Sequence, residues 1–230
     1  MPISNTDLIT QVEEAIEAAR RGASNLGPWE LDGVPRLSSH ANLHFLNNVG
    51  AISTAFLELG TYQGSSLVAA STGNDHLRAV GIDGFGHNFE IVDGRKVRHR
   101  DVNVWRGRLL GNMGRIRGRA TVRFFEEDHW SCDHGLVAPY GPFDFYYYDG
   151  SHHFRSQLRA MSAWLDVMAD RYIFVSDDYD LEKIRRATQR GIKYHGLHVI
   201  HDWYLGEDHP QYDVENEWGT GFYVAILEKP

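Results

Sequence analysis

The chain has 230 residues, of which 42% are hydrophobic and 23% are charged, and its formal net charge is −8 at pH 7. This length and composition are typical of one globular domain that buries about 70% of its unfolded surface. The acidic balance disfavours a nucleic-acid backbone or an anionic membrane as the main partner. One basic run, from Arg95 to Arg119, opposes that trend, although such runs are more often solvated helix faces than anion sites.

The cysteine content and the N-terminal residues indicate in which cellular compartment the protein is expected. The single cysteine, Cys132, cannot form an internal disulfide, which favours a reducing environment. The N-terminal stretch carries acids and lacks the apolar core of a signal peptide, and no segment approaches the roughly 20 apolar residues of a membrane helix. We therefore expect a soluble, cytoplasmic protein with no membrane partner, in which residues 1–50 form a helical cap on an α/β core over 51–230.

Helical and strand patterns alternate along the chain. Apolar residues at helical spacing predict helices over 7–21 and 38–49, joined by a loop rich in Gly and Pro. Strands are predicted at 54–59, 77–83, 120–127, 143–148, 171–176, 196–203 and 221–229. Between them, helices are predicted to begin at 64 and to lie within 102–116, 155–168 and 181–192. The segments 84–100 and 207–218 are expected to be long loops, where lids and binding loops occur.

This alternation predicts a Rossmann-like, doubly wound α/β fold with a mostly parallel, seven-stranded sheet and helices on both faces. No clear helical pattern separates the last two strands, so we expect the sheet to close with an antiparallel strand. In such sheets, ligands bind beyond the carboxyl ends of the strands. The residues that follow each strand are therefore the candidate site.

The loop after the first strand of the core reads "ELGTYQG", from Glu58 to Gly64. Its glycines, Gly60 and Gly64, allow a tight turn and a close approach of a ligand to the backbone. A carboxylate at Glu58 suits a cation better than a pyrophosphate, and Asp83, after the next strand, can accept hydrogen bonds from ribose hydroxyls. A positively charged nucleoside such as S-adenosylmethionine fits both acids. The alternative is a structural turn with an incidental glutamate.

A second group of acids follows two later strands. The stretch "FYYYDGSHHF" breaks from strand to turn at Asp149, and Asp177 and Asp178 end the next strand. If these strands are neighbours, about 4.8 Å apart, the three carboxylates converge. Their mutual repulsion favours a bound divalent cation such as Mg²⁺. The alternative is that Asp177 or Asp178 caps the helix that follows.

His152 lies three residues after Asp149, at the same predicted site. A neutral imidazole can take a proton from a substrate hydroxyl, and the alternative is a supporting or surface histidine. Four aromatic residues in or near the site loops could stack on a flat or sugar ring, or belong to the core. They are Trp130, Trp203, Tyr204 and Trp218.

Together these motifs resemble the class I S-adenosylmethionine-dependent methyltransferases, and within them the metal-dependent O-methyltransferases of the macrocin-type sugar and catechol-type groups. The resemblance covers about residues 56–180 and rests on "ELGTYQG", Asp83, "YDGSH" and "SDDYD". It implies cofactor contacts at Glu58, Gly60, Gly64, Asp83 and Asp128, and metal ligands at Asp149, Asp177 and Asp178. Ser151 departs from the aspartate that many relatives carry, which favours His152 as the base.

We therefore expect an S-adenosylmethionine-dependent, Mg²⁺-dependent O-methyltransferase that acts on a hydroxyl of a small molecule such as a sugar diol or a catechol. Two alternatives remain open: a metal-dependent hydrolase that uses the Asp and His cluster, and a non-catalytic module that binds S-adenosylmethionine. The sequence does not identify the methyl acceptor or the preferred metal, and it leaves homo-oligomer formation open.

Overall fold

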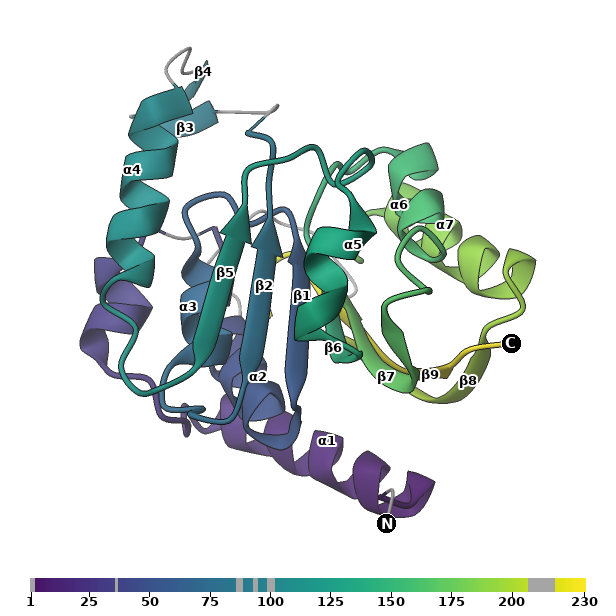
Figure 1. Cartoon of the computed structure of the whole chain (residues 1–230). Helices are drawn as coiled ribbons and strands as arrows, with labels where there is room; N and C mark the ends of the chain where they lie inside the picture. The colour runs from purple at the N-terminus through teal and green to yellow at the C-terminus, as the bar shows by residue number, and fades with distance from the viewer. Residues whose placement is uncertain (1–2, 36, 86–88, 93–94, 99–101, 207–217) are drawn as a thin grey trace.

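A computed structural model describes residues 3–35, 37–85, 89–92, 95–98, 102–206 and 218–230. Seven strands form the main sheet in the order β5-β2-β1-β6-β7-β9-β8 (Figure 1). They are β1 (Ala55–Leu59), β2 (Arg78–Ile82), β5 (Thr121–Phe125), β6 (Phe143–Tyr148), β7 (Met168–Ser176), β8 (His198–Leu205) and β9 (Phe222–Glu228). Only β9 runs antiparallel to its neighbours, β7 and β8. The predicted fold class and its antiparallel closing strand are thus confirmed.

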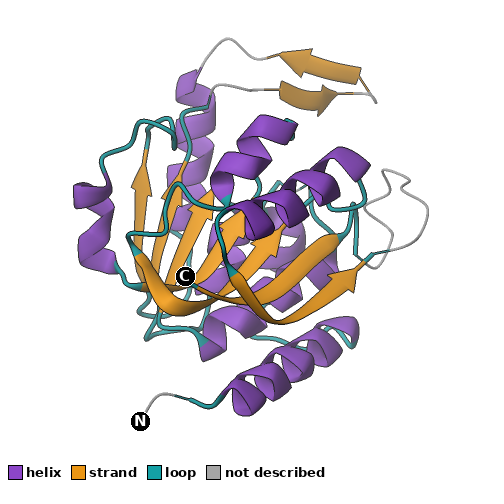
Figure 2. Ribbon diagram, turned by 90° about the vertical axis from the view of Figure 1, so that its right-hand side faces the viewer, coloured by secondary structure: helices purple, strands orange, loops and turns teal. Residues whose placement is uncertain are grey.

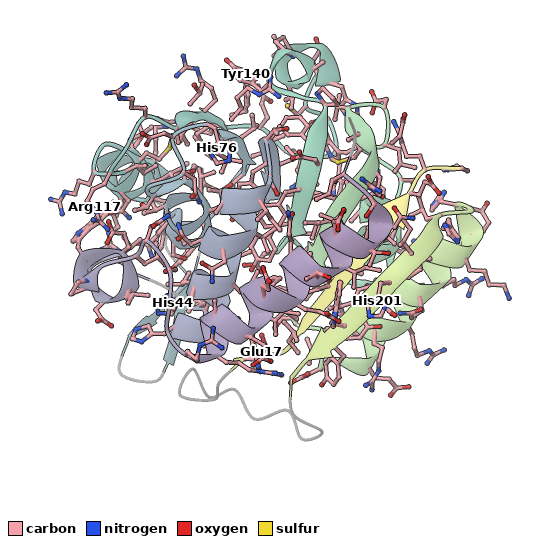
Figure 3. All side chains as sticks on the ribbon, turned by 90° about the horizontal axis from the view of Figure 1, so that it is seen from below. Glu17, His44, His76, Arg117, Tyr140 and His201 are labelled. Carbon is pink, nitrogen blue, oxygen red and sulfur yellow. The ribbon has the colours of Figure 1, made fainter. Side chains whose placement is uncertain are left out.

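Helices cover both faces of this sheet (Figure 2). They are α1 (Asn5–Arg20), α2 (His40–Ile52), α3 (Ser65–Ser71), α4 (Val102–Met113), α5 (His134–Val137), α6 (Phe154–Ala160) and α7 (Glu182–Tyr194), with a short π-helix at Trp29–Gly33 and a 3-10 turn at Ala138–Tyr140. Seen from below, Glu17 and His44 lie on the side of α1 and α2, and Tyr140 lies on the opposite side (Figure 3). Within the described residues, no helix combines the length and apolar composition needed to cross a membrane.

The central strands are buried on both faces, which explains their nearly continuous apolar sequence. On β6, Phe145 and Tyr147 point into the core beneath α1 and α2, whereas Tyr146 and Tyr148 point into the core beneath α6 and α7. Side chains alternate between faces with a period of two residues. The aromatic residues of β6 therefore pack into the two hydrophobic cores on opposite faces of the sheet. Tyr147 pairs with Glu58 of β1, so their side chains lie on the same face.

Two predicted segments differ in the structure. The helix predicted over 155–168 ends at Ala160, because hydrogen bonds from residue i to residue i−3 at Ser162, Leu165 and Val167 tighten the chain into successive turns before β7. The polar loop predicted over 84–100 contains a two-stranded antiparallel sheet, β3 (Phe89–Val92) with β4 (Arg95–Arg98). Figures 1 and 2 show it apart from the main sheet, near α4. Residues 207–217 of the other predicted loop lie outside the described residues.

Candidate active site

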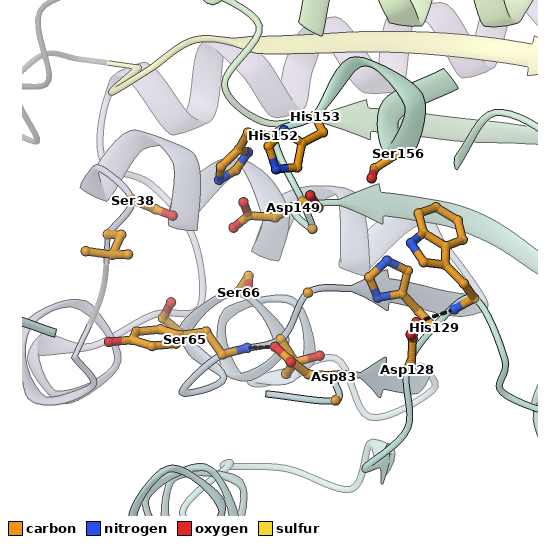
Figure 4. A pocket seen from close by; sticks show the side chains of 18 of the residues that line it. Ser38, Ser65, Ser66, Asp83, Asp128, His129, Asp149, His152, His153 and Ser156 are labelled. Carbon is orange, nitrogen blue, oxygen red and sulfur yellow. Dashed lines mark hydrogen bonds between the residues drawn. The ribbon is translucent and has the colours of Figure 1, made fainter. Parts of the chain in front are cut away.

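An open pocket of about 990 Å³ lies beyond the carboxyl ends of the parallel strands (Figure 4). Its volume is in the range of small-molecule sites. The lining residues come from several segments: Leu37, Ser38, Gly60, Thr61, Tyr62, Ser65, Ser66, Asp83, Gly84, Asp128, His129, Trp130, Asp149, Gly150, Ser151, His152, His153, Ser156 and Lys183. Strand ends after β1, β2, β5 and β6 thus contribute to one cavity, as expected for this sheet topology.

The two glycines of the first loop are required by close packing as well as by backbone conformation. Gly60 has φ +93°, and a Cβ there would lie 2.1 Å from the carbonyl oxygen of Asp149. Gly64 has φ +84° at the N-cap of α3, and its Cβ would lie 2.5 Å from Cδ1 of Leu109. A side chain at either position would be strained and would clash. Gly60 lines the pocket, whereas Gly64 supports it from behind.

Glu58 lies beneath the glycine loop and is fully buried, so it does not line the pocket. Its Oε1 accepts a hydrogen bond from the Ser66 hydroxyl, and its Oε2 has no hydrogen-bond partner among the described residues. Burial raises the pKa of Glu58 to about 8, despite the hydrogen bond from Ser66. The carboxyl group is therefore largely protonated at neutral pH.

Asp83 lies at the pocket wall and is held by two backbone groups. Its Oδ2 accepts from the Tyr62 N–H at 2.7 Å, and its Oδ1 accepts from the Phe85 N–H at 2.6 Å. Tyr62 and Phe85 both have left-handed backbone conformations, with φ of 47° and 51°. Among the described non-glycine residues, the only other such φ is at Asp178. Backbone strain of this kind concentrates at functional sites. Here the strained residues Tyr62 and Phe85 donate the N–H groups that hold the Asp83 carboxylate, and its remaining lone pairs face the pocket.

Asp128 follows β5 and also lines the pocket. Its Oδ1 accepts from the Trp130 N–H at 2.8 Å, which holds the turn that carries His129 and Trp130. The rings of His129 and Trp130 lie 4.3 Å apart. This turn presents flat side chains at the end of the pocket that is near Asp83 (Figure 4).

A cluster of titratable groups lies at the other end of the pocket, where Asp149 and His152 line the cavity and Asp178 does not. One ligand atom from each of Asp149, His152 and Asp178 lies within 4.8 Å of the other two. His152 Nδ1 lies 2.7 Å from Asp178 Oδ2, with 43% of the His152 side chain exposed. The cluster exists because β6 and β7 are parallel neighbours, with Tyr148 opposite Ser176. Asp149, Asp178 and His152 are thus brought together as the sequence predicted.

Asp177 lies next to this cluster but outside it. Its Oδ1 accepts from the Asp178 N–H at 2.8 Å, and its Oδ2 accepts from the Tyr147 hydroxyl at 3.0 Å. The same hydroxyl lies 3.3 Å from Asp149 Oδ2. The sequence predicted that three carboxylates converge. In the structure Asp177 is connected to Asp149 only through the Tyr147 hydroxyl, which lies near both carboxyl groups. Sequence reasoning treated Tyr147 only as a strand residue, although the period-two alternation of the strand could have placed it on this face.

The electrostatics of the cluster reflect crowded negative charge. Burial raises the pKa of Asp149 well above its usual range, and the charges of Asp177 and Asp178 add to this effect. Burial also raises the pKa of Asp177 to about 7. Burial disfavours the charged forms of both His152 and Asp178. The hydrogen bond between the two side chains favours the charged forms and is the stronger effect, so the pKa of His152 is raised and the pKa of Asp178 is lowered. An added cation would relieve the remaining repulsion.

The donor set suits a hard divalent cation, which prefers oxygen ligands and keeps places for water or substrate. The capping alternative receives no support, because the N-cap of α7 is Leu181 and no side chain hydrogen-bonds to that helix end. The residues present therefore fit a metal, with Asp149 and Asp178 as the oxygen donors nearest to each other and to His152.

The other residues that the sequence singled out lie elsewhere. Trp218 is buried in the core, with its ring centre 6.2 Å from that of Phe45, and neither Trp203 nor Tyr204 lines the pocket.

Several arginines of the basic run, Arg95 to Arg119, contact other side chains of the protein. Arg106 pairs with Glu126, Arg117 pairs with Glu30, and the guanidinium groups of Arg108 and Arg115 lie over the rings of Trp105 and Trp29. The interpretation of this run as a structural surface is thus supported for these four arginines.

Comparisons with known proteins agree with this geometry. The family model described as "Methyltransferase domain" matches residues 57–179, more than half of the chain. No curated protein matches the sequence. Among solved structures, a putative caffeoyl-CoA O-methyltransferase from Staphylococcus aureus is similar, with 13% identity, coverage of 96% of this chain and 98% of that one, and a TM-score of 0.57. TomG from Streptomyces achromogenes, an O-methyltransferase in complex with SAM, has 13% identity, coverage of 95% and 89%, and a TM-score of 0.52.

A third similar structure is the cofactor-bound Rv0187 from MTB, with 16% identity, coverage of 96% and 90%, and a TM-score of 0.52. At these identities the structural likeness establishes the fold, and the family assignment rests on the sequence match. That match extends from β1 to Tyr179 and contains the glycine loop and the acids after β2, β6 and β7. The chain therefore belongs to the methyltransferase-domain family.

Proposed function

We propose that this protein is an S-adenosylmethionine-dependent O-methyltransferase that methylates a hydroxyl of a small molecule with the help of a divalent cation, Mg²⁺. The observation that carries the proposal is the division of one pocket into two ends. Asp83 lies at one end, and Asp149, His152 and Asp178 cluster at the other. The first end suits a nucleoside, and the second suits a hydroxyl that must lose a proton.

The cofactor end is supported by three features of the chain. Asp83 is held by backbone N–H groups with lone pairs left for ribose hydroxyls. Gly60 keeps the loop wall free of side chains, and the turn at Asp128 offers the rings that an adenine would contact. Glu58 would act from beneath the loop, where it accepts a hydrogen bond from Ser66, a residue that lines the pocket. S-Adenosylmethionine supplies a methyl group activated by a sulfonium charge.

At the acceptor end, Asp149 and Asp178 would hold the cation, and Asp177, joined to Asp149 through Tyr147, is the third carboxylate. The cation supplies charge that lowers the pKa of a bound hydroxyl. Asp178 orients His152 by its contact with Nδ1, which leaves Nε2 to face the acceptor. Despite burial, the contact with Asp178 raises the pKa of His152, so the base is the fraction of the imidazole that is neutral. With the proton of that ring on Nδ1, Nε2 carries the lone pair that takes the hydroxyl proton.

The N-terminal segment supports a role as a cap. Leu37 and Ser38, which precede α2, line the pocket, while α1 and α2 cover one face of the sheet. We infer that residues 1–50 belong functionally to the methyltransferase domain and close its acceptor end. Substrates with two adjacent oxygens, such as a catechol or a sugar diol, suit a cation-bearing site.

Calorimetric titration with S-adenosylmethionine, with and without Mg²⁺, tests the proposal. Wild type should bind the cofactor, and it should give a Mg²⁺ heat that Asp149→Ala/Asp178→Ala lacks, while circular dichroism shows that both proteins are folded. Transfer of labelled methyl to catechol or to a vicinal diol then tests turnover. Folded wild type that binds no cofactor would overturn the proposal and favour a metal-dependent hydrolase. Cofactor binding without transfer to any hydroxyl would leave a non-catalytic binding module.

A further inference from the structure

Lys183 lines the pocket and has no role in the proposed function. It lies in the first turn of α7 and is the only lysine or arginine among the described residues that line the pocket. It follows Asp178 closely in the chain, at the start of the helix that comes after β7, so it lies on the side of the pocket that carries Asp178 and His152. Its charge acts to lower the pKa of both. We consider two roles for the Lys183 ammonium: neutralising the carboxylates of the cluster, or binding an anionic group of a ligand in the pocket.

The geometry argues against simple neutralisation. Within the part of the chain that the structure describes, the Lys183 ammonium forms no ion pair or hydrogen bond with a carboxylate, although it is close enough to influence two of the cluster residues. His152, in contrast, contacts Asp178 at 2.7 Å. A lysine selected to balance the acids would pair with one of them in the same way. Lys183 instead keeps its donors exposed at the pocket wall.

We propose that the methyl acceptor is a hydroxy acid, in which a carboxylate stands apart from the hydroxyl that is methylated, and that Lys183 binds this carboxylate. This inference rests on the proposed function and names its substrate class. A single ammonium suits a monovalent carboxylate better than a dianionic phosphate, since the described pocket wall offers no second lysine or arginine. Leu37, which is 55% exposed and lines the same pocket, offers apolar contact to the carbon skeleton between the two groups.

The test uses two probes that differ only in charge, 3,4-dihydroxybenzoate and its neutral amide, 3,4-dihydroxybenzamide. Binding of each is measured by calorimetry on the full chain with Mg²⁺ and S-adenosylhomocysteine present. Wild type should bind the benzoate about tenfold more tightly than the amide, as expected for a charged hydrogen bond at a partly exposed site. Lys183→Met should erase this preference without weakening the amide, and Lys183→Arg should restore most of it.

Lys193→Met is the matched control, because Lys193 is an exposed lysine on the same helix that does not line the pocket. It makes the same change in net charge and should leave the preference intact. The proposal is overturned if wild type binds the benzoate no more tightly than the amide, including the case where it binds neither. It is also overturned if Lys183→Met and Lys193→Met reduce the preference equally.

Methyl transfer to the two probes separates this inference from the proposed function. If transfer occurs and the Lys183-dependent preference appears in KM rather than in kcat, both stand. If the preference is found in binding but no methyl group is transferred, the O-methyltransferase proposal fails, and with it the claim that the hydroxy acid is a methyl acceptor, whereas carboxylate binding by Lys183 stands. If transfer occurs equally on both probes and Lys183→Met changes neither, the enzyme proposal survives and the hydroxy-acid inference is wrong.

Discussion

The acidic residues at the two ends of the pocket differ in how they are hydrogen-bonded and in how burial changes their pKa values. At the cofactor end, Asp83 accepts hydrogen bonds from two backbone N–H groups, and burial raises the pKa of Glu58 so that its carboxyl group is mostly neutral. At the acceptor end, Asp149 and Asp177 crowd together with raised pKa values, the first cause being burial and the second their neighbouring carboxylates. The carboxylate of Asp83 is therefore held in place by the protein, whereas the crowded carboxyl groups at the other end are the reason for proposing a bound cation there.

The largest effect is expected from Asp149→Asn, which tests whether the acceptor end depends on a cation. The variant should lose more than about 1,000-fold in methyl transfer, since it removes an oxygen donor where charge develops. Mg²⁺ binding should disappear, while S-adenosylmethionine binding should change less than about threefold. Asp170→Asn is the control, because Asp170 is 98% exposed on β7, at the other end of that strand. Equal loss of cofactor binding in Asp149→Asn would show that the two ends are not separate.

His152→Ala sharpens the comparison by separating proton removal from metal binding. Loss of a general base costs about 100-fold to 10,000-fold in rate, so kcat should fall by that factor. Mg²⁺ affinity should stay within about fivefold of wild type, because the two carboxylates remain. His195→Ala, at the C-cap of α7, provides the control. If His152→Ala abolishes the Mg²⁺ heat in calorimetry, the imidazole is a metal ligand and not the base.

Glu58→Gln tests the claim that the cofactor end holds a neutral carboxyl group. The pKa of an unfolded glutamate is about 4.5 and burial raises that of Glu58 in the folded protein to about 8, so between these values the folded state holds a proton that the unfolded state lacks. Stability therefore falls as pH rises through this window, by about 1.4 kcal/mol per pH unit for one proton.

Urea unfolding of Glu58→Gln between pH 5 and 8 should show a slope reduced by about that amount, because the amide does not titrate. Asp149, Asp177 and His152 contribute to the remaining slope, because their raised pKa values also keep protons on the folded state that the unfolded state has lost. An unchanged slope in Glu58→Gln would mean that Glu58 is ionised when folded, and the contrast between the two ends would then disappear.

The smallest effect is expected from Tyr147→Phe. Burial and the neighbouring carboxylates raise the pKa of Tyr147, so its hydroxyl remains a donor to Asp149 and Asp177. Its removal should weaken Mg²⁺ binding by about tenfold, the effect typical of a residue that orients metal ligands. Tyr146→Phe deletes a comparable buried hydroxyl, bonded to the Ala160 carbonyl at 3.1 Å, and should leave Mg²⁺ affinity unchanged. Equal losses in both variants would indicate a general effect of packing.

The contrast between the two ends also shows where sequence reasoning stopped. It identified Glu58 near the end of β1 and acids after β2, β5, β6 and β7, but it assigned Glu58 the role of a charged group that meets the ligand directly. The structure buries Glu58 beneath Ser66, on the face of β1 that is covered by helices. Charge state depends on burial, and burial depends on which elements cover a strand face. No local pattern contains that information.

The sequence by itself determined the strand and helix order, the mostly parallel sheet and the positions of Asp83, Asp149 and Asp178 at strand ends, because hydrophobic periodicity and chain breaks are local properties. Only the tertiary structure decided that Tyr147 links Asp149 to Asp177 and that Asp178 holds His152. These contacts depend on β6 and β7 lying side by side in one register. Sheet order arises from packing between segments that are distant in the chain, and a local pattern does not specify it.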